Sequence, residues 1–225
     1  MNPAAEPLTI RISDDQRVSG LLLAPAKVTT CYVFAHGAGA GMKHAFMTTF
    51  AEGLAERGVA TLRYQFPYME NGSKRPDAPN VAHAAVRAAT AQALVHFPEL
   101  PLIAGGKSFG ARMTSQAQAL EPLPGVSGLA FVGFPLHPAG KPAVDRADHL
   151  KQVGIPMLFL QGTRDELADL ELLRPVVKKL GSLATLALFE DADHSFHVRA
   201  RSGWTDAQVL SAMFDSFVEW AAQCK

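Results

Sequence analysis

A serine lies in a glycine-rich stretch that could hold it as a nucleophile. Residues 105–111 read G-G-K-S-F-G-A, which places Ser108 at the centre of a G-x-S-x-G pattern. An apolar run precedes the pattern, and a stretch of helical character follows it. In a strand–turn–helix of this kind the serine is lifted above the sheet in a strained turn, and the flanking glycines let strand and helix pack closely. We therefore expect Ser108 to be the nucleophile of an acyl-transfer reaction.

A serine hydroxyl is a weak nucleophile until a base takes its proton and a third group orients that base. In this architecture the acid and the histidine follow the serine along the chain, each just past a later strand. Asp165 comes soon after the apolar residues 157–160, and His194 comes soon after the apolar residues 184–189. The order and the positions predict a triad of Ser108, His194 and Asp165.

Neighbouring side chains compete for two of these roles. Glu166 and Asp169 are the alternative acids, but we expect both to lie within a following helix, and Asp165 could instead cap that helix. His197 is the alternative base, and we expect it to point into the next helix or loop. The remaining histidines lie outside any late strand end, and the first of them is expected to support the loop that follows it: His36, His44, His83, His96, His137 and His149.

A second glycine-rich stretch could help to bind a developing oxyanion. Residues 36–41 read H-G-A-G-A-G and follow a short apolar run. One oxyanion donor is the amide after the nucleophile, here Phe109 N–H, and the other comes from the loop after the third strand. We favour Ala38 N–H, with Gly37 and Gly39 as alternatives. The stretch lacks the G-x-G-x-x-G spacing of a dinucleotide-phosphate loop.

Short apolar runs alternate with helical stretches along the chain. The first two runs flank an S-D-D-Q turn and predict an antiparallel hairpin, whereas the later ones are nearly continuous, as in strands buried on both faces of a parallel sheet. The predicted strands are 8–12, 18–23, 31–35, 59–64, 102–104, 128–132, 157–160 and 184–189, and the predicted helices are 43–57, 80–97, 109–120, 166–180 and 205–222. This alternation predicts an α/β fold, a mostly parallel twisted sheet of about eight strands with helices on both faces and ligands at the carboxyl ends of the strands.

Two stretches rich in proline and glycine, 65–79 and 135–156, are predicted to be irregular and to overhang the catalytic edge. Neither is long enough for a large lid domain, so we expect an open site. Lys74 and Arg75 could recognise a carboxylate or phosphate of the substrate, or could be solvated loop charges. Three apolar side chains of the same stretch could line a pocket or pack in the core: Phe66, Tyr68 and Met69.

Length and composition suit one soluble α/β domain spanning residues 1–225, of which 48% are hydrophobic. The 21 Lys and Arg residues balance the 21 Asp and Glu residues, so no basic field predicts binding to nucleic acid or to an anionic membrane. No apolar run is long enough to span a membrane, and residues 1–13 do not resemble a signal peptide.

Cysteine usage indicates a reducing cytoplasm, since Cys31 and Cys224 make neither a disulfide framework nor a metal-ligand spacing. No H-E-x-x-H motif is present either, so the sequence predicts no metal and no cofactor. Nothing in the pattern distinguishes a monomer from a dimer.

Four blocks of the sequence carry a resemblance to a known family. They are residues 33–40, 63–69, 105–113 and 162–165. With them, the chain resembles a small group of α/β-hydrolases related to dienelactone hydrolases, whose animal relatives include a testis-expressed protein and a subunit of a non-specific-lethal chromatin complex. The resemblance implies an α/β-hydrolase fold and serine-hydrolase chemistry at Ser108, Asp165 and His194. Dienelactone hydrolases use a cysteine nucleophile, so a lactone specificity is not implied.

The expected reaction is hydrolysis of a small carboxylic ester or thioester through an acyl-enzyme intermediate. His194 would take the Ser108 proton, and Asp165 would orient His194. The alternative is a non-catalytic hydrolase-like module that binds a partner or a small molecule. A peptidase would use the same triad, but would usually need a larger domain to select its substrates.

Overall fold

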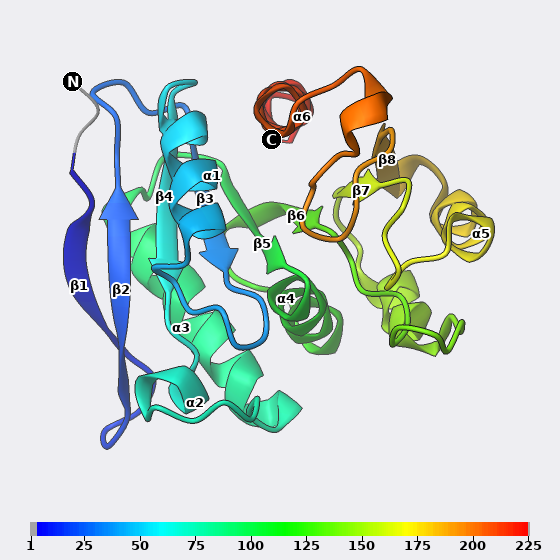
Figure 1. Cartoon of the computed structure of the whole chain (residues 1–225). Coiled ribbons are helices and arrows are strands. Elements are labelled where there is room, and N and C mark those ends of the chain that lie inside the picture. The colour runs from blue at the N-terminus through cyan, green and yellow to red at the C-terminus, as the bar shows by residue number, and fades with distance from the viewer. Residues whose placement is uncertain (1–3, 225) are drawn as a thin grey trace.

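The computed structural model describes residues 4–224, and its centre is one eight-stranded sheet (Figure 1). The strands are β1 (Glu6–Arg11), β2 (Arg17–Leu23), β3 (Thr30–Ala35), β4 (Val59–Tyr64), β5 (Leu102–Lys107), β6 (Val126–Val132), β7 (Met157–Gly162) and β8 (Ala184–Phe189). The α-helices are α1 (Ala45–Ala55), α2 (Pro67–Glu70), α3 (Pro79–His96), α4 (Phe109–Leu120), α5 (Leu170–Leu180) and α6 (Asp206–Ala221). Three short 3-10 segments complete the list: η1 (Asp145–Gln152), η2 (Gly181–Leu183) and η3 (Ala200–Ser202).

The sheet has the order β1-β2-β4-β3-β5-β6-β7-β8. β1 and β2 form the predicted antiparallel hairpin, β2 is also antiparallel to β4, and all other pairs are parallel. The chain leaves β3 toward β4 and returns to β5 on the other side of β3. At such a switch point the loops after the two neighbouring strands diverge and leave room for a ligand. The predicted mostly parallel α/β sheet is confirmed.

Helices cover both faces of the sheet because alternate side chains of each central strand point to opposite sides. In β3, Tyr32 and Phe34 pack with the buried faces of α1 and α6. Cys31 and Val33 belong instead to the core beneath α3, α4 and α5. Both faces are therefore apolar, and polar chemistry is left to the loops at the strand ends.

Three sequence-based expectations need correction. The helix expected from residue 166 begins at Leu170, because Asp169 caps it by accepting a hydrogen bond from Glu171 N–H at 2.9 Å. The stretch 65–79 contains α2, which starts with Pro67 at a position that favours a helix. The stretch 135–156 contains η1.

The described residues include no separate lid domain over the carboxyl edge of the sheet. Within residues 4–224, none of the helices is both long and apolar enough to cross a bilayer.

Candidate active site

Ser108 occupies a strained turn between β5 and α4. Its φ is 51° and its ψ is −111°, a conformation rare for a residue with a side chain. Ser108 N–H donates to Val132 O at 3.1 Å and ties the turn to β6. A Cβ atom at Gly106 or at Gly110 would lie 2.5 Å from Ala35 O, so both glycines are needed for the close approach of β3.

The loops after β7 and β8 bring an acid and a histidine together. A Cβ atom at Gly162 would lie 2.3 Å from Ala192 O, which shows how closely the two loops approach. His194 Nδ1 lies 2.7 Å from Asp165 Oδ2. Because a carboxylate only accepts hydrogen bonds, this nitrogen carries the proton, and Nε2 is left to accept one.

The carboxylate of Asp165 is held by two further donors. Gln161 Nε2 donates to the same oxygen that receives His194, and Leu167 N–H donates to Oδ1 at 2.8 Å. Asp165 is 5% exposed, so it is shielded from water, and each of its carboxylate oxygens accepts a hydrogen bond. Such a carboxylate can fix the tautomer and orientation of the imidazole.

The competing acids and base have other roles or positions. Asp169 is the N-cap of α5, not a residue further inside that helix, and Glu166 is exposed. His197 Nδ1 lies 2.6 Å from Asp206 Oδ2 at the start of α6, and this contact raises the pKa of His197. None of these side chains contacts Asp165 or His194 through a hydrogen bond.

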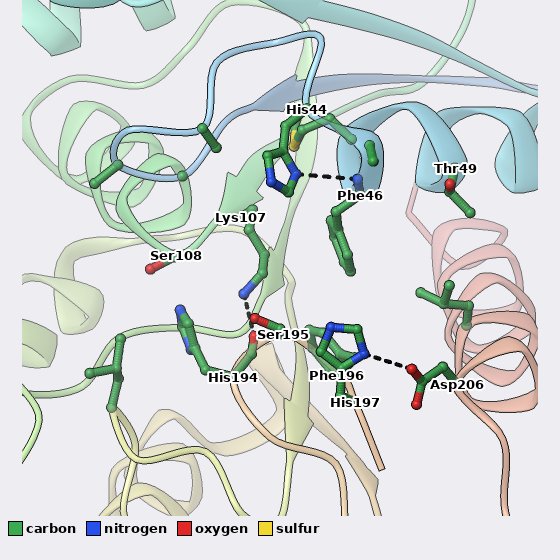
Figure 2. A pocket seen from close by; sticks show the side chains of 17 residues that line it. His44, Phe46, Thr49, Lys107, Ser108, His194, Ser195, Phe196, His197 and Asp206 are labelled. Carbon is green, nitrogen blue, oxygen red and sulfur yellow. Dashed lines mark hydrogen bonds and ion pairs between the residues drawn. The ribbon is translucent and has the colours of Figure 1, made fainter. Parts of the chain in front are cut away.

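Ser108 and His194 border the same pocket, and Figure 2 shows the His194 ring beside the Ser108 side chain. Within residues 4–224, no hydrogen bond joins Ser108 to His194. Catalytic hydrogen bonds are often long in the unliganded protein and tighten when the substrate binds. The structure thus brings the three triad candidates, Ser108, His194 and Asp165, to one edge of the sheet.

The loop after β3 lies against Ser108. A Cβ atom at Gly37 would lie 3.8 Å from Ser108 Cβ. Gly39 N–H donates to the Tyr68 hydroxyl at 3.0 Å and is not available to a substrate. Ala38 N–H has no partner within the described chain and borders the Ser108 pocket, so Ala38 and Gly37 remain as candidate oxyanion donors.

His36 supports this loop as the sequence predicts. Its Nδ1 lies 2.7 Å from Gly37 O, and its Nε2 accepts a hydrogen bond from Phe66 N–H at 3.1 Å. Burial lowers the pKa of His36 to about 4. The ring is therefore neutral near pH 7 and links the loop after β3 to the loop after β4.

Lys107, for which the sequence suggests no role, contacts the histidine loop. Its Nζ donates to His194 O at 2.5 Å and lies over the rings of Phe46 and Phe196, 5.7 and 5.4 Å from their centroids (Figure 2). Burial lowers the pKa of Lys107 to about 8, while the nearby carboxylates of Asp165 and Asp193 act in the opposite direction. The G-G-K-S block was the signal that could have pointed to this lysine.

The pocket that Ser108 and His194 share has a volume of about 600 Å³. Its apolar wall comes from α1, α6 and the loop after β8 and includes Leu210. Phe46 and Phe196 belong to the same wall (Figure 2). No sequence motif marks these residues, because they reach the site only through the packing of α1, α6 and the loop after β8.

The five predicted substrate contacts lie elsewhere. Phe66 and Tyr68 are buried and pack around Phe109, with ring centroids 5.2 and 6.3 Å from its centroid. They thus support the turn at Ser108 and the loop after β3. Met69 borders a different pocket, while Lys74 and Arg75 are exposed and line neither of the two pockets that border Ser108.

Potential metal ligands do not cluster in the described part of the chain, where no group of three or more His, Cys, Asp or Glu side chains could hold an ion. Cys31 and Cys224 are free and buried.

Comparisons with known proteins agree with this fold. An α/β-hydrolase domain family matches residues 28–222. The fold is similar to that of a dienelactone hydrolase from Anabaena variabilis (TM-score 0.77, 20% identity, covering 100% of this chain and 99% of that one). It is also similar to an α/β serine hydrolase homologue from Coxiella burnetii (TM-score 0.72, 20% identity, covering 99% of this chain and 98% of that one). A third similar structure is a lidless α/β serine hydrolase from Xanthomonas campestris (TM-score 0.74, 19% identity, covering 99% of this chain and 95% of that one). Because the family match covers most of its length, the chain belongs to the α/β-hydrolase family.

Proposed function

We propose that this protein is a serine hydrolase that cleaves small carboxylic esters or thioesters through an acyl-enzyme intermediate. The observation that carries the proposal is the 2.7 Å contact of Asp165 with His194, a histidine that lines the same pocket as Ser108. Membership of a hydrolase family and structural neighbours described as serine hydrolases and an esterase domain support it.

In this mechanism His194 Nε2 removes the proton of Ser108 as the hydroxyl oxygen attacks the substrate carbonyl. The amides of Phe109 and Ala38 bind the oxyanion, each donor lowering the barrier by about 2.7–4 kcal/mol. The protonated imidazole then gives its proton to the leaving group, and Asp165 stabilises the imidazolium. Water attacks the acyl-enzyme by the same route and releases the acid.

The open edge of the sheet suits short substrates. The pocket of about 600 Å³ falls within the range that holds a small molecule, and much of its wall is apolar. An ester with a short acyl or aryl group would fit without any domain movement. The free, buried cysteines agree with a reducing compartment such as the cytoplasm, and the single continuous sheet agrees with one domain.

The test is labelling by a fluorophosphonate probe together with hydrolysis of short p-nitrophenyl esters. The wild-type protein should be labelled by the probe and should hydrolyse the esters, whereas Ser108→Ala should do neither. Ser182→Ala, which removes an exposed hydroxyl in η2, is the matched control and should behave as wild type. A wild-type protein that neither labels nor hydrolyses any ester would favour the non-catalytic binding module, and full activity in Ser108→Ala would exclude this nucleophile.

A further inference from the structure

A second pocket borders Ser108 and has a volume of about 430 Å³. Ser108, Ala38 and Phe109 line it, so it contains the proposed nucleophile and both proposed oxyanion donors. Two cationic side chains also line it, Arg112 from α4 and Arg146 from η1. The reacting carbonyl of a substrate would thus lie between an apolar pocket and a cationic one.

The two guanidinium groups have no anionic partner in residues 4–224. Neither side chain takes part in an ion pair or a hydrogen bond, and Arg112 Nε is fully buried without a partner. Burial lowers the pKa of Arg112, and the charge of Arg146 lowers it further, so the two cations are close enough to repel each other. Like charges placed together in a pocket without an ion-pair partner are typical of functional sites.

Neighbouring titratable groups do not neutralise this pair. Asp77 also lines the pocket, but its Oδ2 accepts a hydrogen bond from Tyr68 N–H at 2.9 Å, and it forms no ion pair with either arginine. His149 lies near Arg112, and burial together with that charge lowers the pKa of His149 to about 4, so the ring is neutral near pH 7. The two arginines therefore outnumber the single carboxylate in the pocket.

We propose that Arg112 and Arg146 bind an oxyanion of the substrate, a carboxylate or a phosphate, and that the preferred esters are anionic. The inference rests on the proposed function, because it requires Ser108 to be the nucleophile between the two pockets. A guanidinium presents paired N–H donors that match either oxyanion, and both arginines line the pocket beside Ser108. The apolar part of the substrate then occupies the pocket beside Phe46 and Phe196.

Matched esters test this preference. With the anion on the alcohol side, the butyrate esters of 4-hydroxybenzoate and of 4-hydroxyphenyl phosphate are compared with the butyrate ester of 4-hydroxybenzamide. With the anion on the acyl side, p-nitrophenyl hydrogen adipate is compared with p-nitrophenyl hexanoate. In at least one set, kcat/KM for the anionic ester should exceed that of its neutral counterpart by about tenfold or more. The two alcohol-side anions show whether a carboxylate or a phosphate is preferred.

Charge-removing variants test whether the two arginines cause the preference for anionic esters. Arg112→Gln and Arg146→Gln should each reduce kcat/KM for the anionic ester by about ten- to a hundredfold and leave hydrolysis of the neutral ester largely intact. Arg146 is partly exposed, so its variant remains informative if Arg112→Gln fails to fold. Arg174→Gln, which removes an exposed charge on α5, is the control and should keep the wild-type preference. The absence of any preference in wild type, or an equal loss for neutral and anionic esters, overturns the inference.

Failure of the proposed function can be recognised separately. Fluorophosphonate labelling and neutral-ester hydrolysis report on Ser108, whereas calorimetry of Ser108→Ala with 4-hydroxybenzoate and with phenyl phosphate reports on the cationic pocket alone. Anion binding without labelling would reject the hydrolase and keep the anion site. Labelling without anion binding or anionic preference would keep the hydrolase and reject the site.

Discussion

Lys107 Nζ donates a hydrogen bond to the backbone carbonyl of His194 at 2.5 Å. The residue that precedes the proposed nucleophile thus holds the loop that carries the proposed base. Two residues of that loop, Asp191 and Phe196, have positive φ values of 62° and 66°, so its backbone needs support from its surroundings. The lysine supplies such support while its ammonium lies against the rings of Phe46 and Phe196.

Replacing this lysine should lower the rate of the chemical step. Lys107→Met keeps much of the side-chain volume but loses the hydrogen bond, so the His194 ring should shift relative to Ser108. A shift of about 1 Å can cost a hundredfold, and we expect kcat to fall by about ten- to a hundredfold with a much smaller change in KM. Steady-state kinetics with a neutral p-nitrophenyl ester measures both constants. Lys107→Arg retains a cationic donor and should recover part of kcat; wild-type kcat in Lys107→Met would show that the bond does not position the base.

The lowered pKa of Lys107 predicts how stability depends on pH. The pKa is about 8 in the folded protein and near 10.5 in the unfolded chain. Between these values the unfolded chain holds a proton that the folded protein has released, so this residue's contribution to the free energy of unfolding rises with pH. Below about pH 8 both states are protonated, and the cost of burying the charge is fully present.

Urea unfolding of wild type and Lys107→Met from about pH 7 to about pH 10 measures this contribution. The difference in unfolding free energy should move in favour of the wild type as the pH rises. The difference for Lys27→Met, a change on the exposed loop before β3, should stay constant over the same range. A constant difference for Lys107→Met would mean that its pKa is not lowered.

The fold and the order of the triad candidates followed from local patterns in the sequence. Each predicted strand was a short apolar run, and Ser108, Asp165 and His194 each follow one of these strands. Glycine spacing was informative because a side chain at Gly106 or Gly110 would clash with Ala35 O. Such signals are contained within a few neighbouring residues.

Other features depend on contacts between distant segments and could not be predicted. Lys107 and His194 are 87 residues apart, and only the pairing of β5, β6, β7 and β8 brings their loops together. Arg112 and Arg146 likewise approach through the packing of η1 on α4. The expected substrate contacts Phe66 and Tyr68 are apolar residues near a strand end, and the sequence could not decide between a pocket wall and the core.

Asp165→Asn should lower kcat with little loss of structure. The amide cannot accept from all the donors that now surround the carboxylate, and the neutral side chain no longer stabilises the imidazolium. We expect kcat to fall by roughly 10³- to 10⁴-fold. Asp169→Asn is the matched control, because asparagine also caps helices well and Asp169 does not contact His194. A similar loss of kcat in both variants would indicate general destabilisation instead of a catalytic acid.

Tyr68→Phe tests whether the loop after β3 must be held for catalysis. The Tyr68 hydroxyl accepts a hydrogen bond from Gly39 N–H at 3.0 Å. In Tyr68→Phe the Gly39 amide, which is next to that of Ala38 in the chain, loses this partner. The lost hydrogen bond should reduce the free energy of unfolding by about 1–2 kcal/mol, measured by urea denaturation. If Ala38 is an oxyanion donor, the looser loop should also lower kcat by about tenfold, since the misplaced amide weakens a contact made in the transition state.

Because Phe109 N–H is fixed by α4, it should not be affected, and activity should persist at the reduced level. Reduced stability with wild-type kcat would assign the second donor to an amide that Tyr68 does not influence, of which Gly37 N–H is the nearest candidate.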